Sequence, residues 1–211
     1  MGKENPIEDL REIRKMMESS SKFLSLSGLS GVFAGLSALV GAWFAYLEME
    51  RMNGLQYWYY MQDRMSDWGD ELSMRLAFIA IIVLIAALSF GILFTWLKAR
   101  KQQKKLWTPL SFRLLISLMV PLGFGGLFVI GLYYQGFYVL VAPATLIFYG
   151  LALLNGSKYV HVDIKYLALC QMALGVLALF KLYYGLIFWA IGFGVLHILY
   201  GLIMYFKYDR K

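Results

Sequence analysis

The sequence predicts an all-α integral membrane protein with six transmembrane helices, preceded by a cytoplasmic amphipathic helix. Of its 211 residues, 60% are hydrophobic and 16% are charged, whereas a soluble domain is usually about half apolar and about a quarter charged. A bilayer core about 30 Å thick needs about 20 apolar residues from each helix that crosses it. Six runs are close to this length: Phe23 to Leu47, Leu76 to Leu97, Leu114 to Tyr133, Phe137 to Leu154, Tyr166 to Phe180 and Tyr184 to Phe206.

Residues 1–22 come before the first run and are predicted to form the cytoplasmic amphipathic helix. Pro6 suits the first turn of a helix. Ile7 and Leu10 begin an apolar stripe at helical spacing, and charged residues cover the opposite face. We interpret this segment as a helix that lies on the lipid surface. The alternative is that residues 6–22 dock a cytoplasmic protein partner.

The six runs pair into three antiparallel hairpins that resemble one another in sequence. Leu-Tyr-Tyr at 132–134 returns at 182–184, and Tyr-Gly-Leu at 149–151 returns at 200–202. The first pair of runs fits the repeat more loosely. Because a hairpin of two spans keeps its orientation, such repeats are related by an axis along the membrane normal, which predicts pseudo-threefold symmetry. The hairpins are predicted to span residues 23–98, 112–158 and 163–208 of one domain, 23–211.

Each predicted helix carries a glycine at a corresponding position, which indicates close helix packing. Helices in lipid gain no hydrophobic energy from each other, so small residues that let two backbones approach are a main source of packing energy. In the repeat, Gly125 matches Gly175, and Gly91 aligns with the second helix of the later hairpins. Small residues of the first helix serve either this packing or a homo-oligomer. The predicted packing glycines are Gly35, Gly91, Gly125, Gly150, Gly175 and Gly201.

The charges between the runs predict the orientation of the chain. Six basic residues and no acidic residue lie from Lys98 to Arg113, which is typical of a cytoplasmic loop. From Glu48 to Arg75, six acidic residues outnumber three basic ones. Alternation then places both termini in the cytoplasm of a multi-pass protein of the bacterial cytoplasmic (inner) membrane. The net charge of +7 is assigned to topology and the lipid bilayer, not to nucleic acid, because no aromatic and basic platform for single strands is present.

Polar residues inside the apolar runs are the candidate functional groups, because placing them in lipid is costly. No Asp or Glu lies inside the runs. His197 and Gln171 are predicted to lie on adjacent antiparallel helices, within hydrogen-bonding reach. They are candidates for binding a ligand or sensing pH, and the alternative is a structural pair. Convergence of Ser117 and Thr145 on the same cavity would favour transport.

Several chemical functions are not expected. Cys170 is the one cysteine in the chain, so no internal disulfide, thiol pair or metal cluster is predicted. The motifs of nucleotide binding, zinc proteolysis and serine hydrolysis are missing. We therefore expect no enzyme activity, no cofactor and no metal. The acidic and aromatic segment from Glu48 to Arg75 is interpreted as an interfacial belt, with cation binding by Asp63, Asp67, Asp70 and Glu71 as the alternative.

Three motifs carry a resemblance to a known family over essentially the whole chain. They are residues 25–31 (SLSGLSG), 148–152 (FYGLA) and 189–194 (WAIGFG). Together they resemble a family of uncharacterised bacterial six-helix inner-membrane proteins, which implies the fold and brings no assigned activity. The rhythm of the hairpins is also similar to HdeD-like acid-resistance membrane proteins, but the long acidic segment after the first helix departs from that pattern.

These observations predict a non-catalytic polytopic membrane protein that acts as an accessory, scaffold or stress-response component. Small-residue packing and sparse buried polarity describe a lipid-embedded structure better than a hydrophilic pathway. The alternative is a transporter or channel for a neutral, amphipathic or lipid-like solute, which would pass through a cavity between the hairpins.

Overall fold

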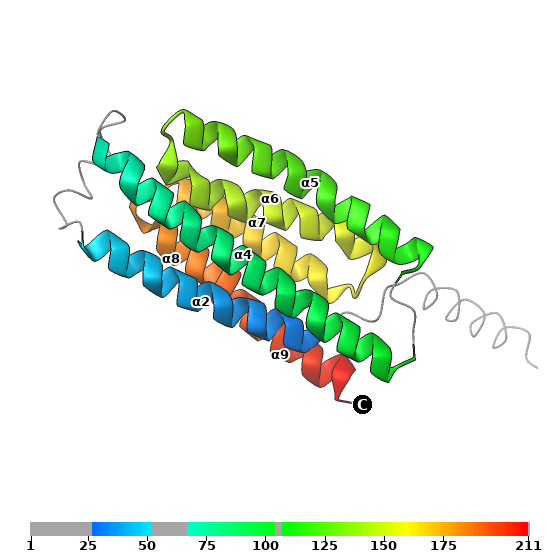
Figure 1. The fold of residues 1–211 in the computed structure, drawn as a ribbon. Coiled ribbons are helices and arrows are strands. Elements are labelled where there is room, and N and C mark those ends of the chain that lie inside the picture. Colours follow the sequence, from blue (N-terminus) through cyan, green and yellow to red (C-terminus); the bar gives the residue numbers. More distant parts are fainter. Residues whose placement is uncertain (1–26, 52–66, 104–106, 211) are drawn as a thin grey trace, which may run out of the picture.

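The computed structural model describes residues 27–51, 67–103 and 107–210, and every regular element in these ranges is helical. Six helical stretches run roughly along one axis and form an elongated bundle (Figure 1). The first five are α2 (Gly28–Arg51), α4 (Asp67–Lys101), α5 (Pro109–Tyr134), α6 (Val141–Gly156) and α7 (Asp163–Leu179). The sixth joins η3 (Leu182–Tyr184), α8 (Gly185–Trp189), the π-helical η4 (Ala190–Leu196), α9 (His197–Met204) and the π-helical η5 (Tyr205–Asp209). Two short turns, η1 (Tyr138–Leu140) and η2 (Ser157–Tyr159), flank α6.

Five of the described helices are long and apolar enough to cross a membrane, which indicates a membrane protein. Large apolar side chains cover their outer surfaces, and on α4 the side chains of Phe78 and Ile92 are 65% and 71% exposed. Such surfaces are stable in lipid and not in water. α7 has 17 residues and is not among the five. The five candidate spans are Gly28–Arg51, Glu71–Lys101, Pro109–Tyr134, Tyr138–Tyr159 and Leu182–Asp209.

The predicted apolar runs overlap these helices, but their ends differ. α4 starts at Asp67, nine residues before the predicted Leu76, because Glu71 and Arg75 continue the helix and form an ion pair one turn apart. α5 begins with a capping box in which Thr108 and Ser111 bond to each other's backbone. Residues 1–22 and Asp63 lie outside the described residues.

Two interfaces between helices are tightly closed, and glycines close both. At the interface of α6 with α7, a Cβ on Gly150 would lie 2.9 Å from the carbonyl oxygen of Ala168. At the interface of α2 with α9, a Cβ on Gly201 would lie 2.7 Å from the carbonyl oxygen of Gly28. Such distances are too short for a side chain, so only glycine permits this approach of the backbones.

The other predicted packing glycines divide into three that make contact and one that does not. Gly175 of α7 meets α6, Gly35 of α2 meets η4, and Gly125 of α5 meets Phe148 of α6. Gly91 of α4 has nothing within 4 Å of the position that a Cβ would take. The packing contact predicted for Gly91 is therefore absent among the described residues. The physical reason is that α4 packs along α2 and α5 packs along α6, while α4 and α5 make few contacts with each other.

Candidate functional site

The two predicted polar residues meet in the middle of the bundle. Gln171 of α7 is fully buried and His197 at the start of α9 is 7% exposed. Both direct a nitrogen at one backbone carbonyl, that of Gly192 in η4: Nε2 of Gln171 at 2.8 Å and Nδ1 of His197 at 3.0 Å. The two side chains lie 3.4 Å apart at these nitrogens. The shared carbonyl, more than their direct contact, holds them together.

The hydrogen bonds show which nitrogen of a neutral imidazole carries the proton. A carbonyl oxygen only accepts, so Nδ1 of His197 carries the proton and donates it to Gly192. Nε2 is then the acceptor of the neutral ring, and the hydroxyl of Tyr149 on α6 donates to it at 2.7 Å. Both nitrogens of a neutral His197 are thus satisfied. The network joins three helices through Tyr149, Gln171 and His197.

Gln171 leaves one polar atom unsatisfied. Its Oε1 has no hydrogen-bond partner among the described residues. A Cβ on Gly192 would lie 2.6 Å from this oxygen, so a glycine at position 192 is what allows the amide to reach the backbone. A π-helical segment, as in η4, frequently marks a functional site, and here it presents a carbonyl to two side chains.

Ser117 and Thr145 do not join this network. The hydroxyl of Ser117 donates to the carbonyl of Asn155 at 3.1 Å, and the amide of Asn155 returns a bond to the carbonyl of Ser117 at 2.8 Å. This reciprocal pair links α5 to α6. The hydroxyl of Thr145 donates to the carbonyl of Ala142 one turn earlier and lies instead on the wall of a cavity.

The cavity has a volume of about 200 Å³ and lies toward the end of the bundle where α2 ends and α4 begins, here called the Glu48 end. Its lining is apolar except for the hydroxyls of Ser73, Thr145 and two tyrosines, and it contains no charged side chain. An engineered apolar cavity of about 150 Å³ in another protein stays dry and binds benzene. The cavity therefore suits hydrocarbon better than water. Its walls come from α2, α4, α6 and α8, with Tyr133 at the end of α5.

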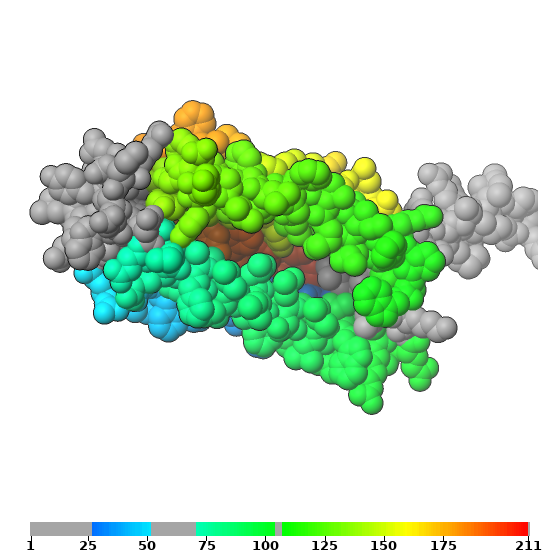
Figure 2. All heavy atoms as spheres, turned by 45° about the horizontal axis from the view of Figure 1, so that its top comes forward, coloured from blue at the N-terminus to red at the C-terminus, as the bar shows by residue number. Residues whose placement is uncertain are grey.

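One side of this cavity faces a cleft between α4 and α5. Figure 2 shows the cleft along the surface, with atoms of the last helical stretch at its floor. At the Glu48 end, the hydroxyls of Ser73 on α4 and Tyr133 on α5 are 3.0 Å apart and form a hydrogen bond. Both residues line the cavity, so the bond closes this end of the cleft.

Aromatic rings fill the space between the cavity and the polar network. Trp189 lines the cavity, and its ring centre lies 5.1 Å from that of Phe193 in η4. Phe193 in turn lies 5.0 Å from Tyr149 and 5.9 Å from His197. Rings at these separations are in contact. The cavity is thus separated from the other half of the bundle by a packed aromatic layer.

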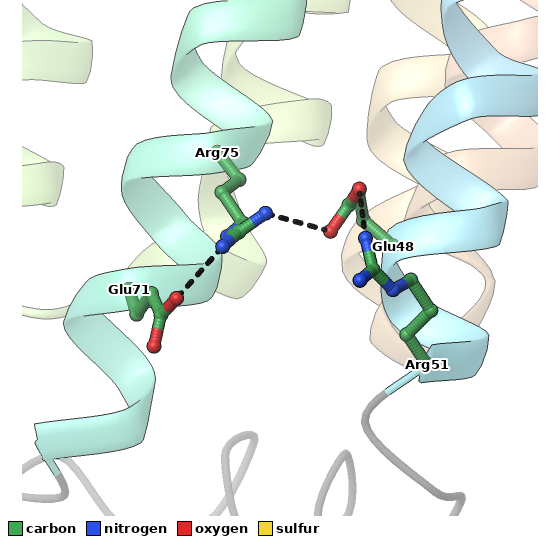
Figure 3. A network of polar contacts seen from close by, with 4 residues as sticks. All are labelled: Glu48, Arg51, Glu71 and Arg75. Carbon is green, nitrogen blue, oxygen red and sulfur yellow. Dashed lines mark hydrogen bonds and ion pairs between the residues drawn. The ribbon is translucent and has the colours of Figure 1, made fainter.

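Ion pairs join the helices at both ends of the bundle. At the Glu48 end, Arg75 of α4 bonds to Glu71 at 2.9 Å and to Glu48 of α2 at 3.5 Å, and Arg51 also bonds to Glu48 (Figure 3). Glu71 was one of four acids considered for cation binding, and it is paired with Arg75. Within the described ranges, no cluster of three or more His, Cys, Asp or Glu side chains has the geometry to hold a metal ion.

At the opposite end, Asp209 holds three segments together. One of its oxygens lies 2.7 Å from Nζ of Lys98 in α4, and the other accepts from the backbone N–H of Gly28 at 2.8 Å and from Ser27. The side chains of Asp209 and Lys98 are only 10% and 11% exposed. Asp209 thus supplies the N-terminal cap of α2 from the far end of the sequence.

Sequence reasoning missed Tyr149, Ser73, Tyr133 and Asp209. Tyrosines are abundant and collect at membrane interfaces, so no local signal separates Tyr149 from the others. Ser73 lies in a segment that was interpreted as an interfacial loop. The role of Asp209 depends on the closure of the bundle, which no local pattern reveals.

We compared the chain with known proteins at three levels. No family model, no curated protein and no solved structure matches it.

Proposed function

We propose that this chain is a non-catalytic, multi-pass membrane protein that binds a neutral, lipid-like molecule inside its helical bundle. The observation that carries this proposal is the apolar cavity of about 200 Å³ among helices of membrane-spanning length. Its hydroxyl groups can hydrogen-bond a polar head, and the absence of charge from its lining disfavours an ionic solute.

Binding is favoured over passage through the protein. The cavity lining reaches Thr145 and Trp189, and about one helical turn further the rings of Tyr149 and Phe193 are packed against each other. The network of Gln171 and His197 lies behind them. This arrangement supports an accessory role, in which the protein holds a lipid-like molecule, more than the alternative of a transporter or channel.

We further propose that α7 crosses the membrane as well, which gives six spans in three hairpins with pseudo-threefold symmetry. Its 17 residues match the lower end of the length that a bilayer requires, about 17 to 25 residues. Both termini would then be cytoplasmic in a bacterial inner membrane. The basic residues Lys98, Arg100 and Lys101 near the end of α4 support this orientation.

Reporter fusions test the six-span topology. A fluorescent protein fused after Gln103 or after Lys158 is expected to fluoresce, since both positions would be cytoplasmic. Alkaline phosphatase fused after Gly136 or after Lys181 is expected to be active, since it requires export. An active phosphatase after Lys158 would show that the end of α6 is not in the cytoplasm, which would contradict the six-span arrangement.

Photo-crosslinking tests the binding function. A monoacylglycerol with a diazirine in its acyl chain is added in excess to the purified protein in micelles, and labelled peptides are identified by mass spectrometry. We expect labelling at peptides that line the cavity, including the one with Trp189. Ala142→Phe fills the cavity and should reduce this labelling by about tenfold, a loss equivalent to about 1.4 kcal/mol of binding energy.

Val176→Phe is the matched control, because Val176 lies on the outer surface of α7 and is 46% exposed. It should leave labelling of the cavity unchanged. Since overpacking can destabilise a bundle, Ala142→Val provides a milder version of the same change. Labelling that is confined to outward-facing residues in the unmodified protein would exclude the binding function.

A further inference from the structure

In the described part of the chain, three interfaces lie between one hairpin and the next, and one of them is open. The interface of α6 with α7 and the interface of the last stretch with α2 are closed by glycines whose Cβ positions meet backbone atoms. The third, between α4 and α5, is the cleft in Figure 2. Gly91 of α4 and Gly126 of α5 both have nothing within 4 Å of their Cβ positions.

The face of α4 that borders this cleft is rich in small residues. Eighteen residues make five full turns of an α-helix, so Gly91 lies on the same face of α4 as Ser73. Between them, that face carries Ala77, Ala80, Leu84 and Ala87, so that all but one of its residues are small. Small residues at this spacing are what closely packed helices in lipid use. The cleft therefore lies beside a helix face whose small residues would allow close packing of α4 with α5.

The hydrogen bond between Ser73 and Tyr133 sets the register of the two faces. α4 and α5 are antiparallel, so positions seven residues along each helix from this bond, Ala80 and Gly126, lie at the same height and on the same two faces. Ala80 is exposed although it lines the cavity. The cavity thus reaches the outer surface beside Ala80.

We propose that the cleft between α4 and α5 is a lateral portal, through which a single-chain lipid with an uncharged, hydrogen-bonding head passes between the surrounding bilayer and the cavity. This inference rests on the proposed binding function and adds the route and the class of ligand. The portal borders helices of membrane-spanning length, so the molecules that reach it are those of the bilayer. Its ligand is a hydrocarbon chain, because the wall is apolar along α4, α6 and α8.

The head group is inferred from the groups at the Glu48 end. Ser73 and Tyr133 place hydroxyls at the end of the cleft, and hydroxyls bond to ester, amide and alcohol groups without requiring charge. Arg75 lies two residues from Ser73, but its guanidinium is already bound to Glu71 and Glu48. An anionic head group would have to compete with both carboxylates. An uncharged head such as that of a monoacylglycerol does not compete with these two carboxylates for Arg75.

The portal is tested by the rate at which the protein takes up lipid from vesicles. The protein is reconstituted in phosphatidylcholine vesicles, vesicles that carry the diazirine monoacylglycerol are added, and samples are illuminated at successive times. Gly126→Trp places a large ring in the cleft at a position that does not line the cavity. It should slow labelling of the cavity by about tenfold or more, as expected when an access step limits the rate. Labelling at long times should equal that of the unmodified protein.

Gly131→Trp is the matched control. Gly131 also has nothing within 4 Å of its Cβ position, but five residues separate it from Gly126, which places it about 140° around the helix. It should load at the normal rate. A second test uses Ala80→Cys with Gly126→Cys in a Cys170→Ser background and a short reducible thiol cross-linker. Cross-linking should slow loading relative to the same double-cysteine variant before the cross-linker is added, and reduction should restore the rate of that variant.

The outcomes separate the portal from the binding function. Normal loading rates in both Gly126→Trp and the cross-linked protein, with cavity labelling intact, would overturn the portal and leave the binding function standing. If the unmodified protein shows no cavity labelling in micelles or in vesicles, the binding function falls and the portal falls with it. If the cross-link does not form, the comparison of Gly126→Trp with Gly131→Trp decides.

Discussion

Tyr149 connects the predicted pair of polar residues to a third helix. The sequence singled out His197 and Gln171 because polar groups inside apolar runs are rare and costly. It gave no sign of the carbonyl of Gly192 or of the phenol of Tyr149, because both depend on the π-helical path of η4 and on the position of α6. The site could therefore be predicted as two residues, and the structure makes it a network of four. Its proposed roles in ligand binding and pH sensing stay predictions.

Tyr149→Phe removes the hydrogen bond to Nε2 of His197. We expect a loss of about 1 kcal/mol in the free energy of unfolding, since hydrogen bonds between membrane helices average about 0.6 kcal/mol and reach about 1.7 kcal/mol. Thermal unfolding in detergent measures the change. Tyr134→Phe is the control, because Tyr134 is 87% exposed, and equal stability of the two variants would show that the bond to His197 is not stabilising.

The helices illustrate how far an apolar pattern can define an element. The apolar runs in the sequence predicted where the described helices lie, because a helix that crosses a membrane must be apolar along its length. They gave the ends poorly: the start of α4 contains charged residues that pair with each other, and the last stretch passes through two π-helical segments without a break. Whether a glycine packs depends on its neighbour. The predicted repeat aligned Gly91 with Gly150 and Gly201, and it could not reveal that Gly91 has no neighbour within 4 Å of its Cβ position.

Gly201→Ala and Gly91→Ala are expected to have opposite effects. A Cβ on Gly201 would lie 2.6 Å from the backbone nitrogen of Val32 and 2.7 Å from the carbonyl oxygen of Gly28, so the backbones must separate, at a cost of about 1 to 3 kcal/mol. A Cβ on Gly91 meets nothing, and alanine is a better helix former by about 1 kcal/mol. Denaturation of both variants in the same detergent compares them. Equal destabilisation would mean that the two interfaces do not differ in packing.

The bundle as a whole is an incomplete ring of helices. Among the described helices, α4 packs mainly against α2, and α5 packs mainly against α6. The ring is closed between α6 and α7 and between α2 and the last stretch, and it is open between α4 and α5. The repeat in the sequence predicted three similar hairpins, and it had no means to predict that one interface of three is open. A cavity exists only where the surrounding side chains do not fill the space between helices. Its presence depends on how all the helices pack together, and no single segment of the sequence reveals it.

Asp209 is predicted to be a major contributor to the stability of the whole bundle. Asp209→Ala leaves the mostly buried ammonium of Lys98 without its ion-pair partner and removes the cap of α2, which should cost about 3 kcal/mol or more. Lys207→Ala is the control, because Lys207 pairs with Asp163 while it is 53% exposed, and such surface pairs contribute at most about 1 kcal/mol. Thermal unfolding should rank Asp209→Ala far below Lys207→Ala, and the reverse order would contradict the role given to Asp209.

The position of Asp209 also affects the time at which the protein becomes stable during synthesis. The N–H of Gly28 is capped by a side chain 181 residues later, so α2 leaves the ribosome long before its cap exists. At about 5 to 20 residues per second, this delay is roughly 10 to 40 seconds. During that interval α2 has neither its cap nor the glycine-lined contact with α9, and a chain that stops short of the last helix never gains them. Synthesis of the last helix is therefore the step at which α2 can gain its cap and its close contact, and chains that stop before this helix are expected to remain loose enough for membrane proteases to remove.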